Sequence, residues 1–174
     1  MTGRRPWEVG DHEQRWLGYL LPPDFKVLRN KLGATTSADL LAAENDLLEV
    51  RLVELRAHPE LVERTFDLRH LQALHRQLFQ DVNEWAGELR TVGMARGGGE
   101  SFVPPIEIER PIAHAADRIR ESSLLQSTAA ADLAGEVAYL YDYINFAHPF
   151  REGNGRTQGE FFAQLLAETG HGLA

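Results

Sequence analysis

Apolar side chains recur at three- and four-residue intervals through most of this 174-residue chain, and this spacing restricts its fold more than any other feature. Such intervals gather the side chains on one face of a helix, where they can pack against other helices. The spacing predicts helices over 37–57, 67–79, 106–122, 130–146 and from about 155 onward. Strands do not alternate with helices, so no parallel sheet is expected. The sequence therefore predicts a mostly α fold.

The segments between these helices give two weaker predictions. Residues 1–34 have no clear periodicity, and a short helix over 25–31 is the one element expected there. Extended runs over 89–94 and 101–103 flank the glycines at 97–99, which is typical of a β-hairpin with a flexible tip. The expected architecture is a helical bundle with one small β-hairpin.

The composition excludes several classes of protein. Hydrophobic residues make up 43% and charged residues 25%, as in a single globular domain, here residues 1–174. A net charge of −8 argues against direct nucleic-acid binding, because phosphate contacts need clustered Lys and Arg. The absence of cysteine excludes disulfides, thiolate nucleophiles and cysteine-bound metals. With no signal-peptide core and no apolar run of about 18 residues, a cytoplasmic protein without membrane spans is expected.

One segment, HPFREGNGR at residues 148–156, lies between the last two predicted helices and holds most of the reactive side chains. Gly153 and Gly155 leave backbone amides uncovered at the start of the next helix, where the helix dipole is positive. Asn154 can add side-chain donors, and Arg156 in the first turn can reach a phosphate. The segment therefore predicts an anion site of the kind that holds phosphate.

Two more residues of this segment predict its chemistry. Glu152 places a carboxylate beside the anion site, an arrangement that normally requires Mg²⁺ between the negative charges. His148 precedes Pro149 and is therefore expected in an extended conformation at the end of its helix. A neutral imidazole at this position can accept a proton from an incoming hydroxyl. Together these groups predict phosphoryl or nucleotidyl transfer.

At these residues the sequence resembles the Fic family, whose motif reads H-x-F-x-(D/E)-G-N-G-R-x-x-R, and residues 148–156 match it without a gap. Three other segments look like Fic segments, namely GYLLPPDFKVLRNKLG at 18–33, NEWAGELRTV at 83–92 and GGGESFVPP at 97–105. The resemblance implies a Fic-fold helical bundle in which the hairpin forms a flap over the active site. It also implies transfer of AMP from ATP to a Ser, Thr or Tyr hydroxyl of a target protein.

The resemblance assigns a role to each matching residue. It makes His148 the catalytic base and Glu152 the Mg²⁺ ligand. The phosphate ligands implied are Gly153, Asn154, Gly155 and Arg156, and Phe150 is implied as the anchor of the loop in the core. The flap residues implied to position the target segment by main-chain pairing are Met94, Arg96, Gly97, Gly98, Gly99 and Phe102.

The sequence departs from the family pattern at Gly159, where the second motif Arg is expected. That Arg orients the γ-phosphate in the family, so weakened activity is expected here. The family's inhibitory pattern, (S/T)-x-x-x-E-(G/N), is also absent, since Leu40 stands four residues before Glu44-Asn45. The chain therefore resembles bacterial Fic toxins inhibited by a separate small antitoxin, whose targets include DNA gyrase and topoisomerase IV. It ends soon after the last helix, so a missing C-terminal piece is expected.

Several alternatives remain open from the sequence. Related proteins use other nucleotide donors, and Gly159 also allows an inactive Fic-fold binding module. Arg156 could pair with Glu160 on the same helix face. Arg151 is expected on the surface, and His70 and His75 are expected as surface and packing residues rather than metal ligands. These last two histidines are five positions apart, which puts them on different helix faces.

Overall fold

The computed structural model describes residues 3–170 and is mostly α, as the sequence predicts. Its α-helices are α1 (His12–Gly18), α2 (Ser37–Ala57), α3 (Leu68–Phe79), α4 (Glu109–Glu121), α5 (Ala130–Ala147) and α6 (Asn154–Glu168). Short 3₁₀ turns occupy Pro6–Glu8, Pro59–Leu61 and Pro105–Glu107. Among these described elements, no helix has the length and apolar character needed to cross a bilayer.

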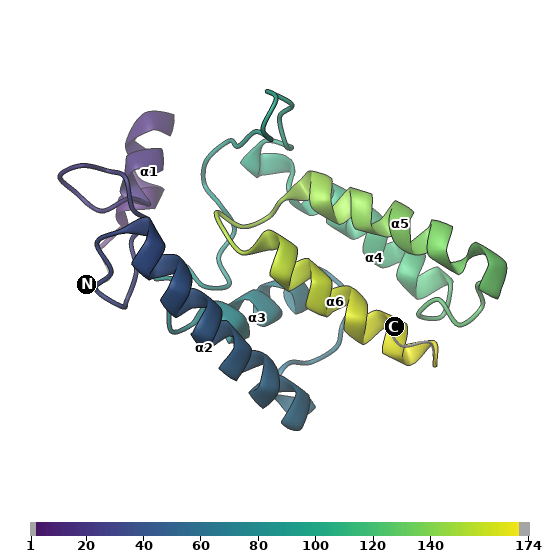
Figure 1. Cartoon of the computed structure of the whole chain (residues 1–174). Coiled ribbons are helices and arrows are strands. Elements are labelled where there is room, and N and C mark those ends of the chain that lie inside the picture. The colour runs from purple at the N-terminus through teal and green to yellow at the C-terminus, as the bar shows by residue number, and fades with distance from the viewer. Residues whose placement is uncertain (1–2, 171–174) are drawn as a thin grey trace.

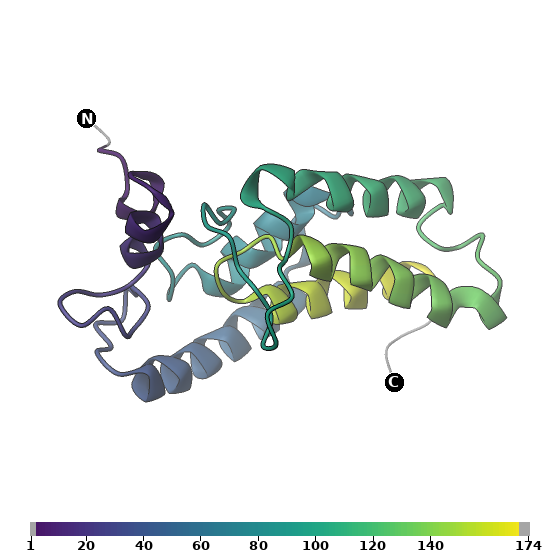
Figure 2. The same cartoon turned by 90° about the horizontal axis from the view of Figure 1, so that it is seen from above.

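Helix α6 lies at the centre of the bundle, in contact with α3 on one side and α5 on the other (Figure 1). α4 packs along α5, and α2 packs against α3. Figure 2 shows α1 at one end of the molecule, while α4, α5 and α6 extend toward the other. The main core lies between α3, α4, α5 and α6, and includes Leu74, Ile112, Leu140, Phe161 and Leu165. This packing holds the ends of α5 and α6 that flank the segment 148–156 in fixed positions.

Helices α2 and α3 begin where their sequence signals predict. α2 covers the predicted 37–57, and the Thr36 hydroxyl accepts a hydrogen bond from the Asp39 amide at 3.1 Å. The Asp67 side chain caps α3 in the same way. α4 begins later than predicted because a 3₁₀ turn, Pro105–Glu107, precedes it.

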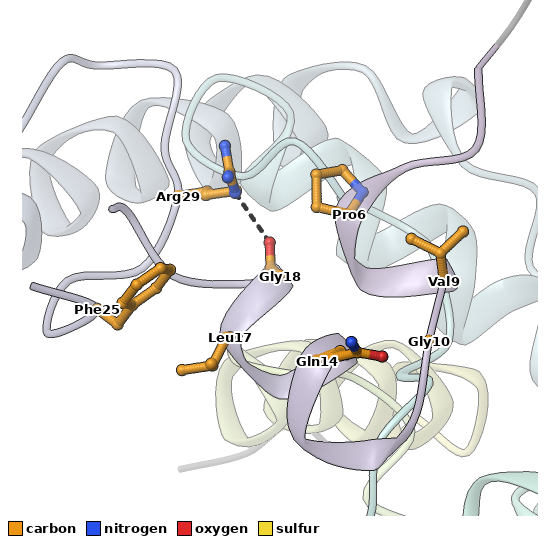
Figure 3. Close-up of a pocket in the computed structure, with 8 residues that line it drawn as sticks. All are labelled: Pro6, Val9, Gly10, Gln14, Leu17, Gly18, Phe25 and Arg29. Atoms are coloured by element: carbon orange, nitrogen blue, oxygen red, sulfur yellow. Dashed lines mark hydrogen bonds between the residues drawn. The ribbon is translucent and has the colours of Figure 1, made fainter. Parts of the chain in front are cut away.

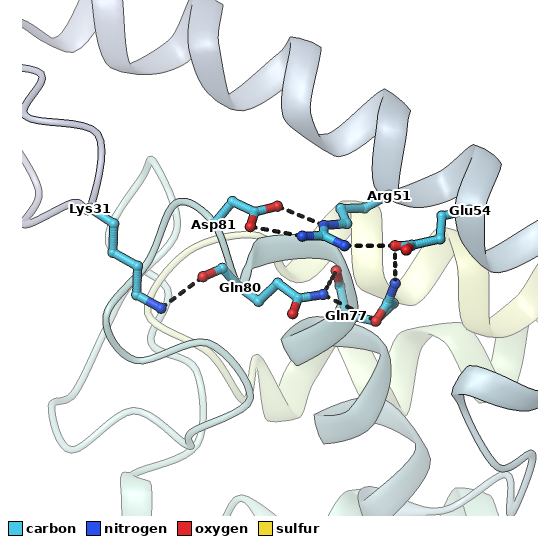
Figure 4. A network of polar contacts seen from close by, with 6 residues as sticks. All are labelled: Lys31, Arg51, Glu54, Gln77, Gln80 and Asp81. Atoms are coloured by element: carbon cyan, nitrogen blue, oxygen red, sulfur yellow. Dashed lines mark hydrogen bonds and ion pairs between the residues drawn. The ribbon is translucent and has the colours of Figure 1, made fainter.

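A polar network joins α2 to the end of α3 (Figure 4). The Arg51 guanidinium donates to both carboxylate oxygens of Asp81, at 2.6 and 2.8 Å, and to Glu54 at 2.7 Å. Gln77 donates to the same Glu54 carboxylate. Because this network lies apart from the segment 148–156, it stabilises the bundle without touching the predicted site.

The prediction of a helix over 25–31 is wrong. Instead the chain folds back on itself, with the Leu21 amide bonded to the Val27 carbonyl at 2.8 Å and the Arg29 amide to the Tyr19 carbonyl at 2.8 Å. The helix in this region is α1, whose start is closed by reciprocal hydrogen bonds between Asp11 and Gln14. This pair is a capping box, a signal visible in the sequence.

The predicted β-hairpin is not formed as two strands in the part of the chain that the structure describes. A single antiparallel bridge joins Ala95 to Ser101, with hydrogen bonds between residues 94 and 102 and between 96 and 100. Residues 89–94, expected as the first strand, bond to other segments instead. The Arg90 amide donates to the Pro149 carbonyl and the Thr91 amide to the Tyr19 hydroxyl. The flap is therefore a loop closed by one bridge.

His70 and His75 are both fully buried, so the expectation that they include surface residues is wrong, while a packing role is confirmed. The Nδ1 atom of His70 accepts from the Phe66 amide at 3.2 Å, and that of His75 accepts from the Gly87 amide at 2.8 Å. Their Nε2 groups donate to the Gln164 side chain and the Glu152 carbonyl. Both rings are therefore neutral, and burial lowers the pKa of each to about 4.

We expect the free energy of unfolding to fall as the pH drops from about 6.5 toward 5. In this window an unfolded His binds a proton, whereas His70 and His75 in the fold do not, so protons favour the unfolded chain. With His148, whose pKa burial also lowers to about 4, three such groups give a slope approaching about 4.1 kcal/mol per pH unit at its steepest. Urea unfolding at several pH values measures it.

Replacing His75 with glutamine should reduce that slope by about one proton. His58→Gln, at an exposed position, is the matched control for the loss of a histidine outside the core. A free energy of unfolding that stays constant between pH 6.5 and 5 would mean that the buried rings are charged in the fold.

Candidate active site

Helix α5 ends at His148, which has a left-handed backbone with φ of 42° and ψ of 62°. The extended conformation predicted for it is wrong. Its amide bonds to the Ile144 carbonyl at 3.1 Å, so the left-handed residue completes the last turn and reverses the chain at once. The extended and the left-handed conformations both avoid the right-handed helical region that a following proline disfavours. His148 adopts the left-handed one because it completes the last turn of α5.

Asn154 closes the loop on itself. Its side-chain oxygen accepts from the Phe150 amide at 2.9 Å, and its side-chain nitrogen donates to the Phe150 carbonyl at 2.7 Å. Phe150 is fully buried and stacks on His75 with ring centroids 4.0 Å apart. One of the two side-chain N–H groups that Asn154 was expected to offer to phosphate is therefore used within the protein, and the backbone amides are further available donors.

The start of α6 has no side-chain cap. Gly153 precedes it with φ of 83°, and the Gly153 carbonyl accepts from the amide and hydroxyl of Thr157. The first amides of α6, at residues 154–156, therefore have no protein acceptor in the described structure. A Cβ atom built on Gly155 would meet nothing within 4 Å, so a ligand can approach these amides closely. This is an uncapped, positively polarised helix end.

Glu152 lies beside this helix end. One of its carboxylate oxygens accepts from the Gly153 amide at 3.2 Å, and the residue lines a hollow together with Lys26, Arg151 and Arg156. Between residues 3 and 170 no group of three or more His, Asp or Glu side chains could hold a metal by itself. Mg²⁺ bound by one carboxylate plus phosphate oxygens needs no such group, so the residues present fit that ion.

Arg156 bridges α6 to α2 rather than pairing with Glu160 as one alternative proposed. Its guanidinium donates to the Glu44 carboxylate at 2.5 Å and to the Asn45 side-chain oxygen at 2.9 Å. Burial raises the pKa of Glu44 despite this pairing. Glu160 instead accepts from Gln164. Arg156 is therefore paired with a carboxylate of α2, and its remaining N–H groups are the ones open to a phosphate.

Arg151 is not a surface residue, contrary to expectation. Its guanidinium lies over the Trp16 ring, with Cζ 4.3 Å from the ring centroid, and also faces Tyr19 at 5.8 Å. Its Nε atom is buried without an acceptor in the described residues, and burial lowers its pKa. The side chain thus adds a cation to the wall of the hollow beside Glu152.

The His148 ring stacks on Phe102 of the flap, with centroids 3.8 Å apart and an interplanar angle of 11°. Its Nδ1 atom is buried without a hydrogen-bond partner among the described residues. Burial first, and then the positive charges of Arg90 and Arg96, lower the pKa of His148 to about 4. The ring is therefore neutral at pH 7 and free to accept a proton.

The flap extends from this stacking contact to an open tip. Met94 and Phe102 line a hollow that also includes Trp16 of α1. The Arg96 guanidinium lies 5.3 Å from the Phe102 ring centroid. At the tip, Gly97, Gly98 and Gly99 have no neighbouring atoms within 4 Å of an added Cβ. Phe102 is thus brought next to His148, with Met94 and Arg96 beside Phe102 and the glycine tip exposed.

A separate hollow lies in the N-terminal segment (Figure 3). Its lining includes Phe25, Gln14 and Arg29, and the Arg29 Nε atom donates to the Gly18 carbonyl at 2.8 Å. Arg29 is the one ionisable side chain among the described residues of this lining, and it is directed toward that carbonyl in Figure 3. None of the residues predicted for the site lines this hollow, so we assign it no chemistry.

Sequence reasoning missed four residues that contact the site: Glu44, His75, Arg90 and Arg151. Glu44 contacts Arg156 from 112 positions away, and Arg90 contacts His148 from 58 positions away. Neither contact has a local sequence signal. Arg151 lies within the motif segment, but its aromatic partners belong to the N-terminal segment, which was expected to be irregular.

Comparison with known proteins identifies relatives of this arrangement. Residues 65–166 match the sequence profile of the Fic/DOC family. VbhT of Bartonella schoenbuchensis, named a protein adenylyltransferase, is 33% identical over 149 residues, which are 86% of this chain and 30% of VbhT. The probable protein adenylyltransferase Fic of Salmonella typhimurium is 34% identical over 154 residues, covering 88% of this chain and 74% of that protein.

The same comparison extends to solved structures. The Bartonella tribocorum effector BepC with bound AMPPNP superposes with a TM-score of 0.78 at 25% identity. The superposition covers 90% of this chain and 80% of the BepC chain.

Proposed function

The chain belongs to the Fic/DOC family, and from this premise we propose that it transfers AMP from ATP to a Ser, Thr or Tyr hydroxyl of a target protein. The observation that carries the proposal is the uncapped start of α6, whose free amides follow directly on the loop that begins with neutral His148. The names of VbhT and the Salmonella Fic protein, and the AMPPNP bound to BepC, support an adenine nucleotide as the donor.

In the proposed reaction His148 removes the proton from the target hydroxyl. The hydroxyl oxygen attacks the α-phosphorus in line, and the bond to the bridging oxygen breaks to release pyrophosphate. The amides at 154–156 bind the phosphate oxygens and stabilise negative charge in the transition state. Glu152 would hold Mg²⁺, which offsets the charge of the phosphates when bound. Arg156 would join the β-phosphate through its remaining N–H groups.

The flap would hold the target segment beside His148. Its loop, residues 94–102, carries exposed backbone groups that can pair with an extended peptide. Stacking of Phe102 on His148 links the flap to the base, so a peptide paired with the flap would lie next to the imidazole. The modified residue of the target is then selected by its position along the flap.

The direct test uses the purified chain, Mg²⁺, ATP labelled at the α-phosphate and a bacterial lysate. Label should appear in protein with α-labelled ATP and remain absent with γ-labelled ATP. Label from the γ-position alone would show phosphoryl transfer instead, and no label from either nucleotide would contradict the proposal.

We also propose that the chain acts as a toxin restrained by a separate small antitoxin, with a type II topoisomerase such as DNA gyrase or topoisomerase IV as target. The motive is the absence of the inhibitory pattern around Glu44-Asn45. Expression in bacteria should then arrest growth, and purified gyrase should take up label. Unlabelled gyrase and topoisomerase IV beside a labelled lysate protein would reject this choice of target.

A weak or inactive binding module is a second candidate because of Gly159, and Gly159→Arg distinguishes the two. A Cβ atom at this exposed position would meet nothing within 4 Å, so an arginine can be accommodated. A hydrogen bond to a charged phosphate contributes about 1.5–3 kcal/mol, so AMP transfer should rise about tenfold to a hundredfold. Initial rates of label transfer measure the change.

Gly159→Ala is the matched control, since it removes the glycine but adds no cation. It should stabilise α6 by about 1 kcal/mol and leave the transfer rate unchanged. Equal rates in the Arg and Ala variants would contradict a γ-phosphate role for this position.

A further inference from the structure

Arg90 is a buried cation whose partners are all backbone carbonyls. Its side chain is fully covered, with the residue 2% exposed. Nε donates to the His148 carbonyl at 2.7 Å, and one terminal nitrogen donates to the Ala147 carbonyl at 3.1 Å. The guanidinium also donates to the Val92 carbonyl at 2.7 Å and to the Val103 carbonyl at 2.5 Å. No carboxylate pairs with it in the described residues.

Burying the Arg90 charge without a carboxylate partner costs free energy, so the hydrogen bonds to the carbonyls must offset that cost. Burial lowers the pKa of Arg90 to about 10, which leaves the side chain charged at pH 7. The two carbonyls at residues 147 and 148 end α5, where backbone oxygens lack helical partners and the dipole is negative. Arg90 thus caps the C-terminus of α5, although it belongs to a segment that is distant in the sequence.

The other two carbonyls belong to the residues on either side of the flap. Val92 precedes the flap loop and Val103 follows it, so one guanidinium holds both of its ends. The Arg90 backbone adds a fifth bond, from its amide to the Pro149 carbonyl at 2.9 Å. The planar guanidinium has fixed donor directions, so it determines the separation of the groups that it joins.

We propose that Arg90 is a positioning residue that sets the distance between His148 and the flap. The inference rests on the proposed transfer reaction, in which the base and the target hydroxyl must meet within hydrogen-bond range. Displacement of such groups by about 1 Å can lower a rate about a hundredfold. No proton or phosphate need touch Arg90 for this effect.

The nucleotide side of the site is held by other contacts. Asn154 fixes the loop to Phe150, and His75 holds the Glu152 carbonyl at 2.9 Å. The Arg90 side chain makes no hydrogen bond to residues 150–156 in the described structure. Loss of the guanidinium should therefore slow transfer to the target hydroxyl and leave nucleotide binding nearly unchanged. General destabilisation of the fold would instead lower both.

The test compares wild type with Arg90→Lys, which keeps the charge but loses the planar donor set, and with Arg90→Met. We expect the Kd for ADP with Mg²⁺, measured by calorimetry, to stay within about threefold in Arg90→Lys, while AMP transfer to lysate protein falls about a hundredfold. Arg90→Met should lose at least as much transfer. The lysine variant, whose ammonium can still reach one or two of the carbonyls, keeps the test valid should the methionine variant unfold.

The matched control is Arg51→Met, which removes a guanidinium that donates three hydrogen bonds to carboxylates in the network between α2 and α3. It should lower the urea midpoint of unfolding and leave the transfer rate of the folded protein unchanged. Wild-type transfer by Arg90→Lys, or an ADP affinity that falls in parallel with transfer, would overturn the positioning role.

An NMR measurement separates this inference from the proposed function. The ring of Phe102 lies over His148, so the His148 ring protons should carry a ring-current shift that Arg90→Lys reduces, while the His75 signals stay in place. If wild type binds ADP but labels no protein, the proposed AMP transfer is wrong. The NMR shift still tests whether Arg90 sets the distance between His148 and the flap. Unchanged His148 signals in Arg90→Lys would refute it.

Discussion

His148→Asn is expected to lower AMP transfer by about 10³-fold while the fold and the affinity for ADP remain as in wild type. Asparagine lacks a basic nitrogen but tolerates the left-handed backbone that His148 adopts at φ of 42°. The substitution therefore tests the proton acceptor without straining the end of α5. Initial rates of label transfer, calorimetry with ADP and urea unfolding give the three readouts.

The matched control is His58→Asn, because His58 is exposed and pairs with Glu60 at the end of α2. Its transfer rate should equal that of wild type. If His148→Asn retains more than about a tenth of the wild-type rate, the imidazole is not the general base, since a positioned base contributes at least about 10²-fold.

Most of the helical framework could be predicted because its signals are local. The apolar stripes of α3 and α4, and the Thr36 cap of α2, lie within single segments and need no knowledge of the partner helix. α1 was missed because its seven residues carry too short a stripe, although the capping box of Asp11 and Gln14 marks its start. The hairpin was overestimated because the extended run at residues 89–94 bonds to Tyr19 and Pro149 rather than pairing across the flap.

In the candidate site, too, the local features could be predicted and the long-range contacts could not. Residues 148–156 are contiguous, so their residue types alone point to an anion site and a base. Their actual partners could not be predicted, because helix packing brings them from distant segments. Arg156 is held by Glu44 of α2, and Arg151 lies over Trp16 of α1. Asn154 shows a further limit, since its side chain also closes the loop through two hydrogen bonds to Phe150 that its residue type does not predict.

Gly153→Ala is expected to destabilise the fold by about 2–5 kcal/mol and to lower AMP transfer by at least about a hundredfold. Gly153 has φ of 83°, which a side chain disfavours, and an added Cβ would lie 2.5 Å from the Phe79 ring. Phe79 cannot move away, because it is fully buried and stacks on His75 with centroids 4.7 Å apart. The loop must shift instead, and the amides at 154–156 shift with it.

Gly155→Ala provides the stability control, because it adds the same methyl group two residues away where no atom lies within 4 Å. Its urea midpoint should equal or slightly exceed that of wild type, since alanine favours the helix by about 1 kcal/mol. Gly153→Ala should unfold at clearly lower urea, and calorimetry should show weakened ADP binding by the folded fraction. A wild-type midpoint and wild-type ADP affinity for Gly153→Ala would mean that Phe79 yields to the methyl group, and that the close packing of this ring does not fix the anion loop.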